Sequence, residues 1–512
     1  MNNGICRPET AIHVGIVGSP DFCRRMTAIV HSRGLAAESC TASFAEAWSV
    51  ILSRRPNALL IEIGIHHTDR LHAWLRQMLQ QLRERCGADL YVVAALLSSG
   101  HLGYGGDLLF EEGSLRPSRL IDTFIALPPA TMPSIPQLPE QVGNALTLYR
   151  HERARRADGK QPLPPLGAEG WVQSLADPES RELWMRWIPR YAGYTNENPI
   201  IIGETGTGKT NMAYALHLLA GRTGKFVSIT PRDFSSSELI QGELFGAVEG
   251  AYTGAVDKWG LVKSAEKGTL FIDELQSIDK ALQGKLITFI ENKIYRRVGS
   301  AESIEADVRF VFASNESLFE LMESDVLRHD FAYRLERVRL ELPPLRSRRL
   351  DITAGLAYAL AKIHRQRAHT RNIFGINTNA YRMLFSHQWP GNLRQLENTT
   401  AKLCEIADMK GTQSIDEEAV SRVFESRLSG KAATSAEVVS QAASELARLA
   451  LRSNVASLQD SVEHFARLVR MCALEAAGGD LGSASAMIGD HRRLMTFVAQ
   501  DIIAAQETKG GR

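Results

Sequence analysis

Three short segments of this 512-residue chain carry residue types that could bind and cleave a phosphate compound. They are GETGTGKT (Gly203 to Thr210), GAYTGA (Gly250 to Ala255) and GTLFIDEL (Gly268 to Leu275). The first is a glycine-rich segment that ends in lysine and threonine, and the third contains two adjacent acids. Their order along the chain indicates a nucleotide-binding core with an added loop.

The first segment has the pattern of a phosphate loop. The apolar run Pro199 to Ile202 predicts a strand and Asn211 to Leu219 a helix, which is the context that such a loop requires. Its glycines let backbone N–H groups point at an anion, and the helix N-terminus adds positive charge. We expect Lys209 to reach the β- and γ-phosphates of ATP and Thr210 to bind Mg²⁺. The predicted cradle is Gly203, Glu204, Thr205, Gly206, Thr207, Gly208, Lys209 and Thr210.

The third segment predicts a strand, Thr269 to Ile272, that ends in Asp273 and Glu274. Ligands bind at the carboxyl ends of strands in a parallel α/β sheet. We expect Asp273 to hold Mg²⁺ and Glu274 to orient and polarise the attacking water. A solvated strand end would show the same two acids, but their position downstream of a phosphate loop favours catalysis.

The middle segment indicates which class of nucleotide-binding protein this chain resembles. Glycines and alanines surround Tyr252 and Thr253 and are poor residues for a helix interior, so we expect an exposed loop with an aromatic and a hydroxyl at its tip. An ordinary flexible insertion is the alternative. The segment resembles the GAFTGA loop of the bacterial enhancer-binding proteins, the AAA+ activators of sigma-54 RNA polymerase. The resemblance implies a client-binding loop made of Gly250, Ala251, Tyr252, Thr253, Gly254 and Ala255.

The resemblance continues downstream. Asn315 follows the predicted strand Arg309 to Ser314 and takes the place of the family's first sensor. The segment LRHDFAYRL resembles the family's FRxDLYYRL, which implies arginine fingers at Arg328 and Arg334 that complete a neighbouring subunit's site. Local pairing of these arginines with Asp330 or Glu336 is the alternative.

A helical lid is expected next. PPLRSRRLDI (Pro343 to Ile352) resembles the family's lid entrance, and WPGNLRQLEN (Trp389 to Asn398) its second sensor. We expect Asn392 to cap a helix and Arg394 to reach back to phosphate. One departure is Thr230, which stands where the family usually has an asparagine bonded to the catalytic glutamate.

Composition is that of a globular chain with several domains. Hydrophobic residues make up 44% and charged residues 23%, and the net charge of +1 gives no general attraction to nucleic acid or membrane. The six cysteines form no CxxC pair, which argues against a zinc site or a disulfide framework and suits the cytoplasm. No apolar run approaches the length of a membrane span, so no membrane partner is expected.

The N-terminal region, to residue 127, alternates apolar runs with amphipathic stretches, which predicts a small parallel α/β domain. It resembles a response-regulator receiver with a degenerate site. Glu62 stands where the phosphorylated aspartate is expected, either as a permanent acidic stand-in or as a surface residue. Arg116 before Pro117 stands where a receiver has its usual Lys-Pro pair. We therefore expect control by expression, a partner or a ligand rather than by phosphorylation.

The C-terminal region predicts helices. The segment Ala473 to Met495 resembles the Fis-type helix-turn-helix of these activators, with Ser483, Arg492 and Arg493 as candidate DNA-binding residues. Several positions depart from that pattern and there is no excess of basic residues, so loss of DNA binding is the alternative.

The sequence therefore predicts an α/β architecture with an AAA+ core, flanking regulatory and DNA-binding domains, and a helical lid. The expected boundaries are a receiver-like domain 1–127, a Pro-rich linker 128–166, an ATPase core 167–345, a lid 346–427, a connector 428–444 and a helix-turn-helix 445–512. The resemblance implies an ATPase that remodels sigma-54 RNA polymerase at a promoter, with enhancer DNA bound upstream. It also implies a homo-oligomer, a hexameric ring when active and a dimer when inactive. The alternative is an AAA+ ATPase that remodels a different protein client.

Overall fold

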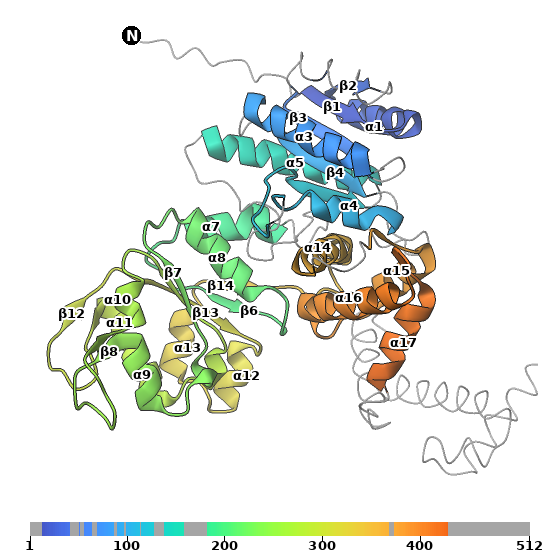
Figure 1. Ribbon diagram of the computed structural model, residues 1–512. Coiled ribbons are helices and arrows are strands. Elements are labelled where there is room, and N and C mark those ends of the chain that lie inside the picture. The colour runs from blue at the N-terminus through green and yellow to red at the C-terminus, as the bar shows by residue number, and fades with distance from the viewer. Residues whose placement is uncertain are drawn as a thin grey trace, which may run out of the picture. The chain divides into compact units, whose positions relative to one another are not determined.

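The computed structural model describes residues 13–40, 51, 56–63, 69–86, 90–96, 99–112, 114–126, 138–157, 182–367 and 373–428 (Figure 1). Residues up to Val423 belong to one compact unit, and a second unit begins at Phe424. The expected helix-turn-helix, with Ser483, Arg492 and Arg493, lies outside the described residues. In the described ranges, no helix is both long enough and apolar enough to cross a membrane.

The N-terminal domain is built on a parallel five-stranded sheet of order β2-β1-β3-β4-β5. This is the doubly wound order that receiver domains share. Every residue of β3 and β4 is buried, because helices cover both faces of such a sheet. The elements are β1 (His13–Val17), α1 (Pro20–Ser32), β2 (Ala36–Cys40), β3 (Ala58–Ile63), α3 (Asp69–Cys86), β4 (Tyr91–Leu96), η2 (Ser99–His101), α4 (Leu102–Asp107), β5 (Thr123–Ala126) and α5 (Leu138–Ala157).

The helix α5 lies inside the segment expected to be a linker. It packs against β5 and α1, and its side chains Val142 and Leu146 are buried there. Pro139 falls in its first turn, where a missing N–H costs little. By its contacts this helix belongs to the N-terminal domain, although the expected boundary at residue 127 leaves it in the linker.

Glu62 is not a surface residue. Its side chain is buried near the carboxyl end of β3, and its Oε2 accepts the backbone N–H of Ser19 at 2.6 Å. The backbone of Gly18 lies so close that a Cβ there would be 2.7 Å from the same oxygen. The carboxylate therefore braces the turn between β1 and α1.

The match of Arg116 to the receiver lysine is wrong. Arg116 precedes β5 and so lies at the amino edge of the sheet, whereas Glu62 lies at the carboxyl end of the parallel strand β3. A cation that acts on the acidic site of a receiver must follow β5. The sequence match failed because an X-Pro pair marks a turn at either end of a strand.

The ATPase core is a second parallel sheet, of order β14-β6-β13-β10-β7, and it confirms the predicted strands β6, β10 and β13. Its continuous apolar core packs helices against these strands. In chain order the elements are η4 (Leu183–Trp187), α7 (Ile188–Ala192), β6 (Ile200–Ile202), α8 (Lys209–Leu219), β7 (Phe226–Ile229), η5 (Pro231–Asp233), α9 (Ser237–Phe245), β8 (Gly246–Ala247), β9 (Lys258–Trp259), α10 (Leu261–Ser264), β10 (Thr269–Ile272), η6 (Leu275–Ser277), α11 (Lys280–Asn292), β11 (Ile294–Tyr295), β12 (Ile304–Glu305), β13 (Arg309–Ser314), α12 (Leu318–Glu323), α13 (His329–Leu335) and β14 (Arg339–Glu341).

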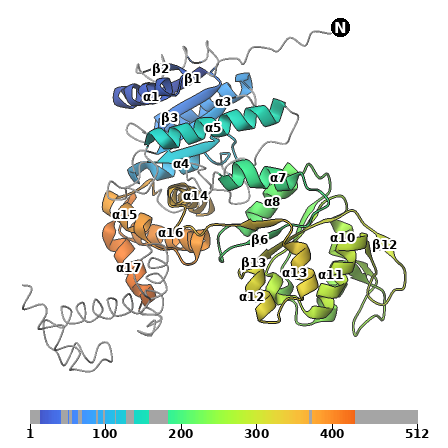
Figure 2. The same ribbon diagram turned by 180° about the vertical axis from the view of Figure 1, so that it is seen from behind.

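The lid is helical, as expected, with one short parallel pair of strands. Its first helix is buried along most of its length, because it packs against α16 on one side and against α4 of the N-terminal domain on another (Figures 1 and 2). The lid elements are α14 (Leu350–Gln366), β15 (Gly375–Ile376), α15 (Thr378–Ser386), α16 (Asn392–Met409), β16 (Ser414–Ile415) and α17 (Glu417–Leu428).

A buried arginine fixes the position of β13, the strand that leads to Asn315. The side chain of Arg309 is 1% exposed, and burial together with the charge of Arg222 lowers its pKa to about 10, so it stays charged at neutral pH. The guanidinium donates to four backbone carbonyls of the segment before β6, those of Tyr191 (2.6 Å), Ala192 (3.2 Å), Tyr194 (3.0 Å) and Glu197 (3.1 Å). These four hydrogen bonds, here called the Arg309 clamp, tie the segment before β6 to β13, the central strand of the sheet.

We predict that Arg309→Ala lowers the free energy of unfolding by about 3 kcal/mol, because it leaves these buried carbonyls without donors. The measurement is the thermal unfolding midpoint of the full chain. Arg339→Ala is the matched control, since Arg339 is exposed on β14 and its loss should change stability by less than about 0.5 kcal/mol. Equal midpoints for the two variants would contradict the clamp.

Candidate functional site

The predicted phosphate loop connects β6 to α8. Gly206 and Gly208 have φ values of 79° and 102°, a backbone region that side chains disfavour. The helix α8 begins directly at Lys209, so its free N–H groups open toward the loop. Thr207 is fully buried and its hydroxyl donates to the carbonyl of Glu204 at 2.8 Å. This cradle fits a polyphosphate.

Lys209 is held in the middle of the cradle. Its Nζ donates to the carbonyl of Gly203 at 2.8 Å and to Oδ1 of Asn315 at 2.5 Å. Burial lowers the pKa of Lys209, and the nearby Asp273 opposes that shift. A buried ammonium held by neutral oxygens is ready to bind a stronger anionic partner.

The two acids follow β10, as predicted. The backbone N–H of Asp273 donates to Ile229 of β7, and its Oδ1 accepts the N–H of Glu274 at 2.9 Å. Glu274 has a φ of 52°, a left-handed conformation that is unusual for glutamate and is typical of functional sites. Its carboxylate lies 3.5 Å from the exposed guanidinium of Arg232. No contact between Thr230 and Glu274 occurs among the described hydrogen bonds.

A single cavity of about 1060 Å³ brings the predicted residues together. The phosphate loop, the acidic pair, the first sensor and the lid each contribute to its wall. The predicted residues that line it are Thr205, Gly206, Gly208, Lys209, Thr210, Asp273, Glu274, Asn315 and Arg394. Thr210 and Asp273 therefore share one cavity, which is the arrangement that an Mg²⁺ ion bound by both would need.

The start of α16 lies directly on the phosphate loop. The backbone N–H of Leu393 donates to the carbonyl of Gly206 at 2.9 Å, and a Cβ on Gly206 would lie 2.4 Å from the carbonyl of Gly391. Arg394, one residue further, is exposed to the cavity. The lid thus places Arg394, the predicted second sensor, beside the cradle.

The prediction that Asn392 caps α16 is wrong. Gly391 occupies the cap position, and Asn392 is the first helical residue, with a φ of 49°. Its side chain is fully buried and bonds to the backbone N–H of Leu345, to the carbonyl of Thr205 and to the carboxylate of Glu204. Asn392 therefore braces the phosphate loop, because its side chain joins Glu204 and Thr205 of the loop to Leu345 at the lid entrance.

Two arginines at the lid entrance also hold the phosphate loop, and sequence reasoning gave them no role. Arg346 forms a bidentate pair with Glu204 at 2.8 and 2.6 Å, and this contact lowers the pKa of Glu204. Arg348 is buried, pairs with Asp351 and donates to the carbonyl of Thr207 at 2.6 Å. The sequence signal for both is the RSR run, Arg346 to Arg348, within the segment PPLRSRRLDI that resembles the family's lid entrance.

Arg328 and Arg334 do not line this cavity. Arg328 pairs with Asp330 at 2.7 Å, and Arg334 pairs with Glu291 and donates to the carbonyl of Asp330. Neither of these two arginine side chains pairs with Glu336, the other local partner that the sequence suggests. Arg328 is exposed and Arg334 half-buried, so both guanidinium groups lie at the surface of the chain.

The GAYTGA segment forms the tip of a hairpin between β8 and β9. Gly250 and Gly254 have φ values of 77° and 81°, and the backbone N–H of Ala255 donates to Tyr252 at 2.9 Å. Thr253 is exposed, as predicted. Tyr252 is only half-exposed, because its ring lies over Gly242 of α9, where a Cβ would come within 2.6 Å of the hydroxyl.

The comparisons with known proteins agree with this geometry. Residues 182–341 match the family model of the sigma-54 interaction domain, and residues 346–437 match that of the AAA+ ATPase lid domain. The lid match begins at the expected residue 346 and ends ten residues after the expected boundary at 427, in a segment outside the described residues.

Among curated relatives, the alginate biosynthesis transcriptional regulatory protein AlgB of Pseudomonas putida is 38% identical over 42% of this chain and 47% of its own length. A putative uric acid sigma-54-dependent transcriptional regulator, UacR of Escherichia coli K12, is 37% identical over 43% of this chain and 38% of its own. The match thus spans less than half the length of either relative.

A crystal structure of NtrX from Brucella abortus in complex with ATP is 20% identical, covers 96% of this chain and 99% of its own, and has a TM-score of 0.44. That overall similarity is too low to carry an argument. The two family matches and the curated relatives together show that residues 182–437 resemble the sigma-54 interaction domain and AAA+ lid of sigma-54-dependent transcriptional regulators.

Proposed function

We propose that this protein hydrolyses ATP in a ring of its own copies and uses the hydrolysis to remodel sigma-54 RNA polymerase at a closed promoter. The observation that carries the proposal is one domain that contains both a complete polyphosphate cradle and a hairpin tip with the exposed hydroxyl of Thr253. A general AAA+ remodeller would need the cradle but not this tip.

The chemistry follows from the cavity wall. The phosphate loop and Lys209 would hold the phosphates of ATP, and Thr210 with Asp273 would hold Mg²⁺. The bound nucleotide supplies the phosphoanhydride bond that is cleaved. Glu274 orients and polarises the attacking water from its left-handed backbone position. Asn315 contacts Lys209 directly and so senses whether the γ-phosphate is present.

Arg328 and Arg334 serve the site of the neighbouring subunit. Their accessibility and their absence from the cavity of their own subunit support a role in trans. A guanidinium stabilises the charge that develops on the transferred phosphoryl group. This arrangement requires a closed ring, for which we propose six subunits, with a dimer as the inactive form.

The mechanical output is a movement of the hairpin tip against sigma-54. Enhancer DNA bound by residues 445–512 would concentrate the ring near the promoter. This activity requires a compartment with ATP and polymerase, which is the cytoplasm. Remodelling of a different protein client remains the alternative, and the third test below separates it.

The first test separates nucleotide binding from hydrolysis. We predict that Glu274→Gln reduces the ATP turnover rate at least about 100-fold while ATP still binds, because the carboxylate acts on water and not on the phosphates. Lys209→Ala should abolish binding as well. The measurements are phosphate release and equilibrium binding of a fluorescent ATP analogue. Loss of binding in Glu274→Gln would contradict the assigned role.

The second test asks whether the fingers act in trans. We predict that Arg334→Ala and Lys209→Ala are each inactive alone and that mixing them restores part of the ATPase activity, because some interfaces then combine an intact cradle with an intact finger. Arg337→Ala is the matched control, since Arg337 is an exposed neighbour paired with Glu197, and this variant should keep its activity. If the mixture stays inactive while the control is active, the trans role is excluded.

The third test concerns the client. We predict that Thr253→Ala keeps the ATPase rate within about twofold but loses formation of open promoter complexes by sigma-54 polymerase, because the exposed hydroxyl contacts the client and not the nucleotide. Thr253→Ser, which retains the hydroxyl, should recover much of the promoter opening. Normal opening by Thr253→Ala would favour a different client-binding surface.

A further inference from the structure

The nucleotide cavity has a wall that the N-terminal domain supplies. The segment between α4 and β5, here named the 110–119 loop and described except at residue 113, lines the same cavity as Lys209 and Arg394. The residues that it contributes include Phe110, Arg116 and Arg119. The core and the lid alone supply the predicted nucleotide-binding residues, so we asked what the N-terminal domain adds to this cavity.

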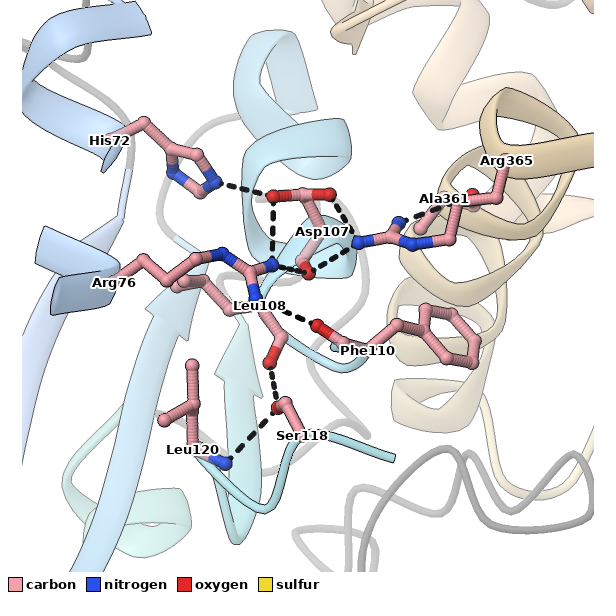
Figure 3. Close-up of polar contacts among 9 residues, drawn as sticks. All are labelled: His72, Arg76, Asp107, Leu108, Phe110, Ser118, Leu120, Ala361 and Arg365. Atoms are coloured by element: carbon pink, nitrogen blue, oxygen red, sulfur yellow. Dashed lines mark hydrogen bonds and ion pairs between the residues drawn. The ribbon is translucent and has the colours of Figure 1, made fainter. Parts of the chain in front are cut away.

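Backbone hydrogen bonds tie together the described residues of the 110–119 loop. Phe110 and Pro117 form an antiparallel bridge, and the backbone N–H of Glu111 donates to Arg116 at 2.8 Å. Ser118 ties the returning strand to Leu109 through its N–H at 2.8 Å, and its hydroxyl bonds to the carbonyl of Leu108 (Figure 3). The two arginines are therefore carried on a preorganised hairpin.

A charged cluster fastens this hairpin to the lid (Figure 3). The carboxylate of Asp107, at the end of α4, pairs with Arg365 of α14 at 2.5 Å and with Arg76 of α3 at 3.0 Å, and it also bonds to His72 at 2.8 Å. Burial alone would raise the pKa of Asp107, but the bond to His72 and the two guanidinium charges hold it well below its usual range. The cluster is therefore ionic at neutral pH.

Close packing surrounds this cluster. A Cβ on Gly106 would lie 1.9 Å from the carbonyl of Ala357, so α4 touches the backbone of α14 directly. Tyr104 stacks on Phe374 of the lid with centroids 4.6 Å apart. Phe110 itself contacts Tyr358 and lies under the guanidinium of Arg365 at 5.1 Å. The same lid helix thus positions the first residue of the 110–119 loop.

Arg116 and Arg119 carry charge toward the cavity. Both are exposed, and within the ranges that the structure describes neither guanidinium has an ion-pair partner. The same cavity is lined by Lys209, whose predicted partner is a polyphosphate. Arginine pairs with phosphate oxygens through a planar fork, and cations in one cavity attract an anion jointly. Two solvated surface arginines would be the ordinary alternative.

We propose that the 110–119 loop is part of the nucleotide site, where Arg116 and Arg119 contribute to binding the polyphosphate anion while the Asp107–Arg365 pair holds the loop in place. The proposal rests on the ATP binding proposed above. Because binding free energies are reciprocal, the bound nucleotide in turn holds the N-terminal domain on the lid. The N-terminal domain would then sense nucleotide occupancy without a phosphorylation site.

The first experiment measures the Kd of a fluorescent ATP analogue with Mg²⁺ for the full chain at low salt. The double variant Arg116→Ala/Arg119→Ala should bind about tenfold more weakly, since each accessible charge contact is worth up to a fewfold in affinity. Arg116→Lys/Arg119→Lys keeps both charges but loses the planar fork, so its Kd should lie between those of the parent and the alanine variant. High salt should reduce the difference, because it screens exposed charges.

The matched control is Arg24→Ala/Arg25→Ala. These arginines lie on α1 of the same domain, pair with Asp21 and do not line the cavity, so their loss removes the same charge from another place. Their Kd should stay within about twofold of the parent, because long-range attraction falls off within a Debye length. An equal loss of affinity in both alanine pairs would overturn the proposal in favour of a general charge effect.

The second experiment tests the docking contact. Arg365→Glu places a carboxylate against Asp107 and should weaken nucleotide binding about as much as Arg116→Ala/Arg119→Ala does. Arg365→Ala introduces no like charge, so it controls for misfolding of Arg365→Glu, and it should also weaken nucleotide binding. Arg367→Ala is the control, since Arg367 pairs with Glu405 within the lid. In the parent, the nucleotide should slow hydrogen exchange of residues 102–119, and Arg365→Glu should remove that protection.

The outcomes separate the two proposals. If the parent chain binds no ATP analogue, the proposed function fails. If the parent binds but Arg116→Ala/Arg119→Ala binds equally well, the role of the 110–119 loop is overturned while the proposed function stands. If Arg116→Ala/Arg119→Ala weakens nucleotide binding and Arg365→Glu does not, the Asp107–Arg365 pair does not position the loop. That half of the proposal is then wrong.

Discussion

The backbone contact between the phosphate loop and the lid is the constraint on which the rest of the site depends. Gly206 approaches Gly391 so closely that no side chain fits between them, and its carbonyl accepts the N–H of Leu393. Because peptide groups cannot be left unpaired in such a contact, Asn392 and Arg348 fill the remaining positions around the loop. Core and lid are therefore joined directly at the phosphate loop.

This unit extends in two directions. Within the core, β10 leads to the acidic pair in a parallel sheet whose neighbours β7 and β13 fix its register, and the hairpin tip projects from β8 and β9 of the same domain. Toward the N-terminal domain, α14 carries Arg365 and Tyr358 against α4 and Phe110. The lid helix α14 thus packs against both the rest of the lid and the N-terminal domain, and close-packed helices transmit strain because they have little free volume.

Much of the core could be predicted from the sequence because its motifs are contiguous. The strand-loop-helix around Lys209 and the strand before Asp273 are each specified by local composition, so the structure confirms their positions. Short elements without strong periodicity were missed, among them β2, α4 and β5. The receiver lysine was mismatched because the local X-Pro signal says nothing about which edge of a sheet a turn lies on.

The sequence by itself determined the chemistry of the cradle, since glycine, lysine, threonine and two acids at fixed spacing leave few other uses. Only the tertiary structure decided which distant groups support that chemistry. Glu204 meets Arg346 across 142 residues of chain, and Asp107 meets Arg365 across 258. No spacing rule links such partners, because their meeting depends on the packing of whole helices rather than on neighbouring residues. The placement of the 110–119 loop in the cavity wall likewise depends on tertiary packing and not on local sequence.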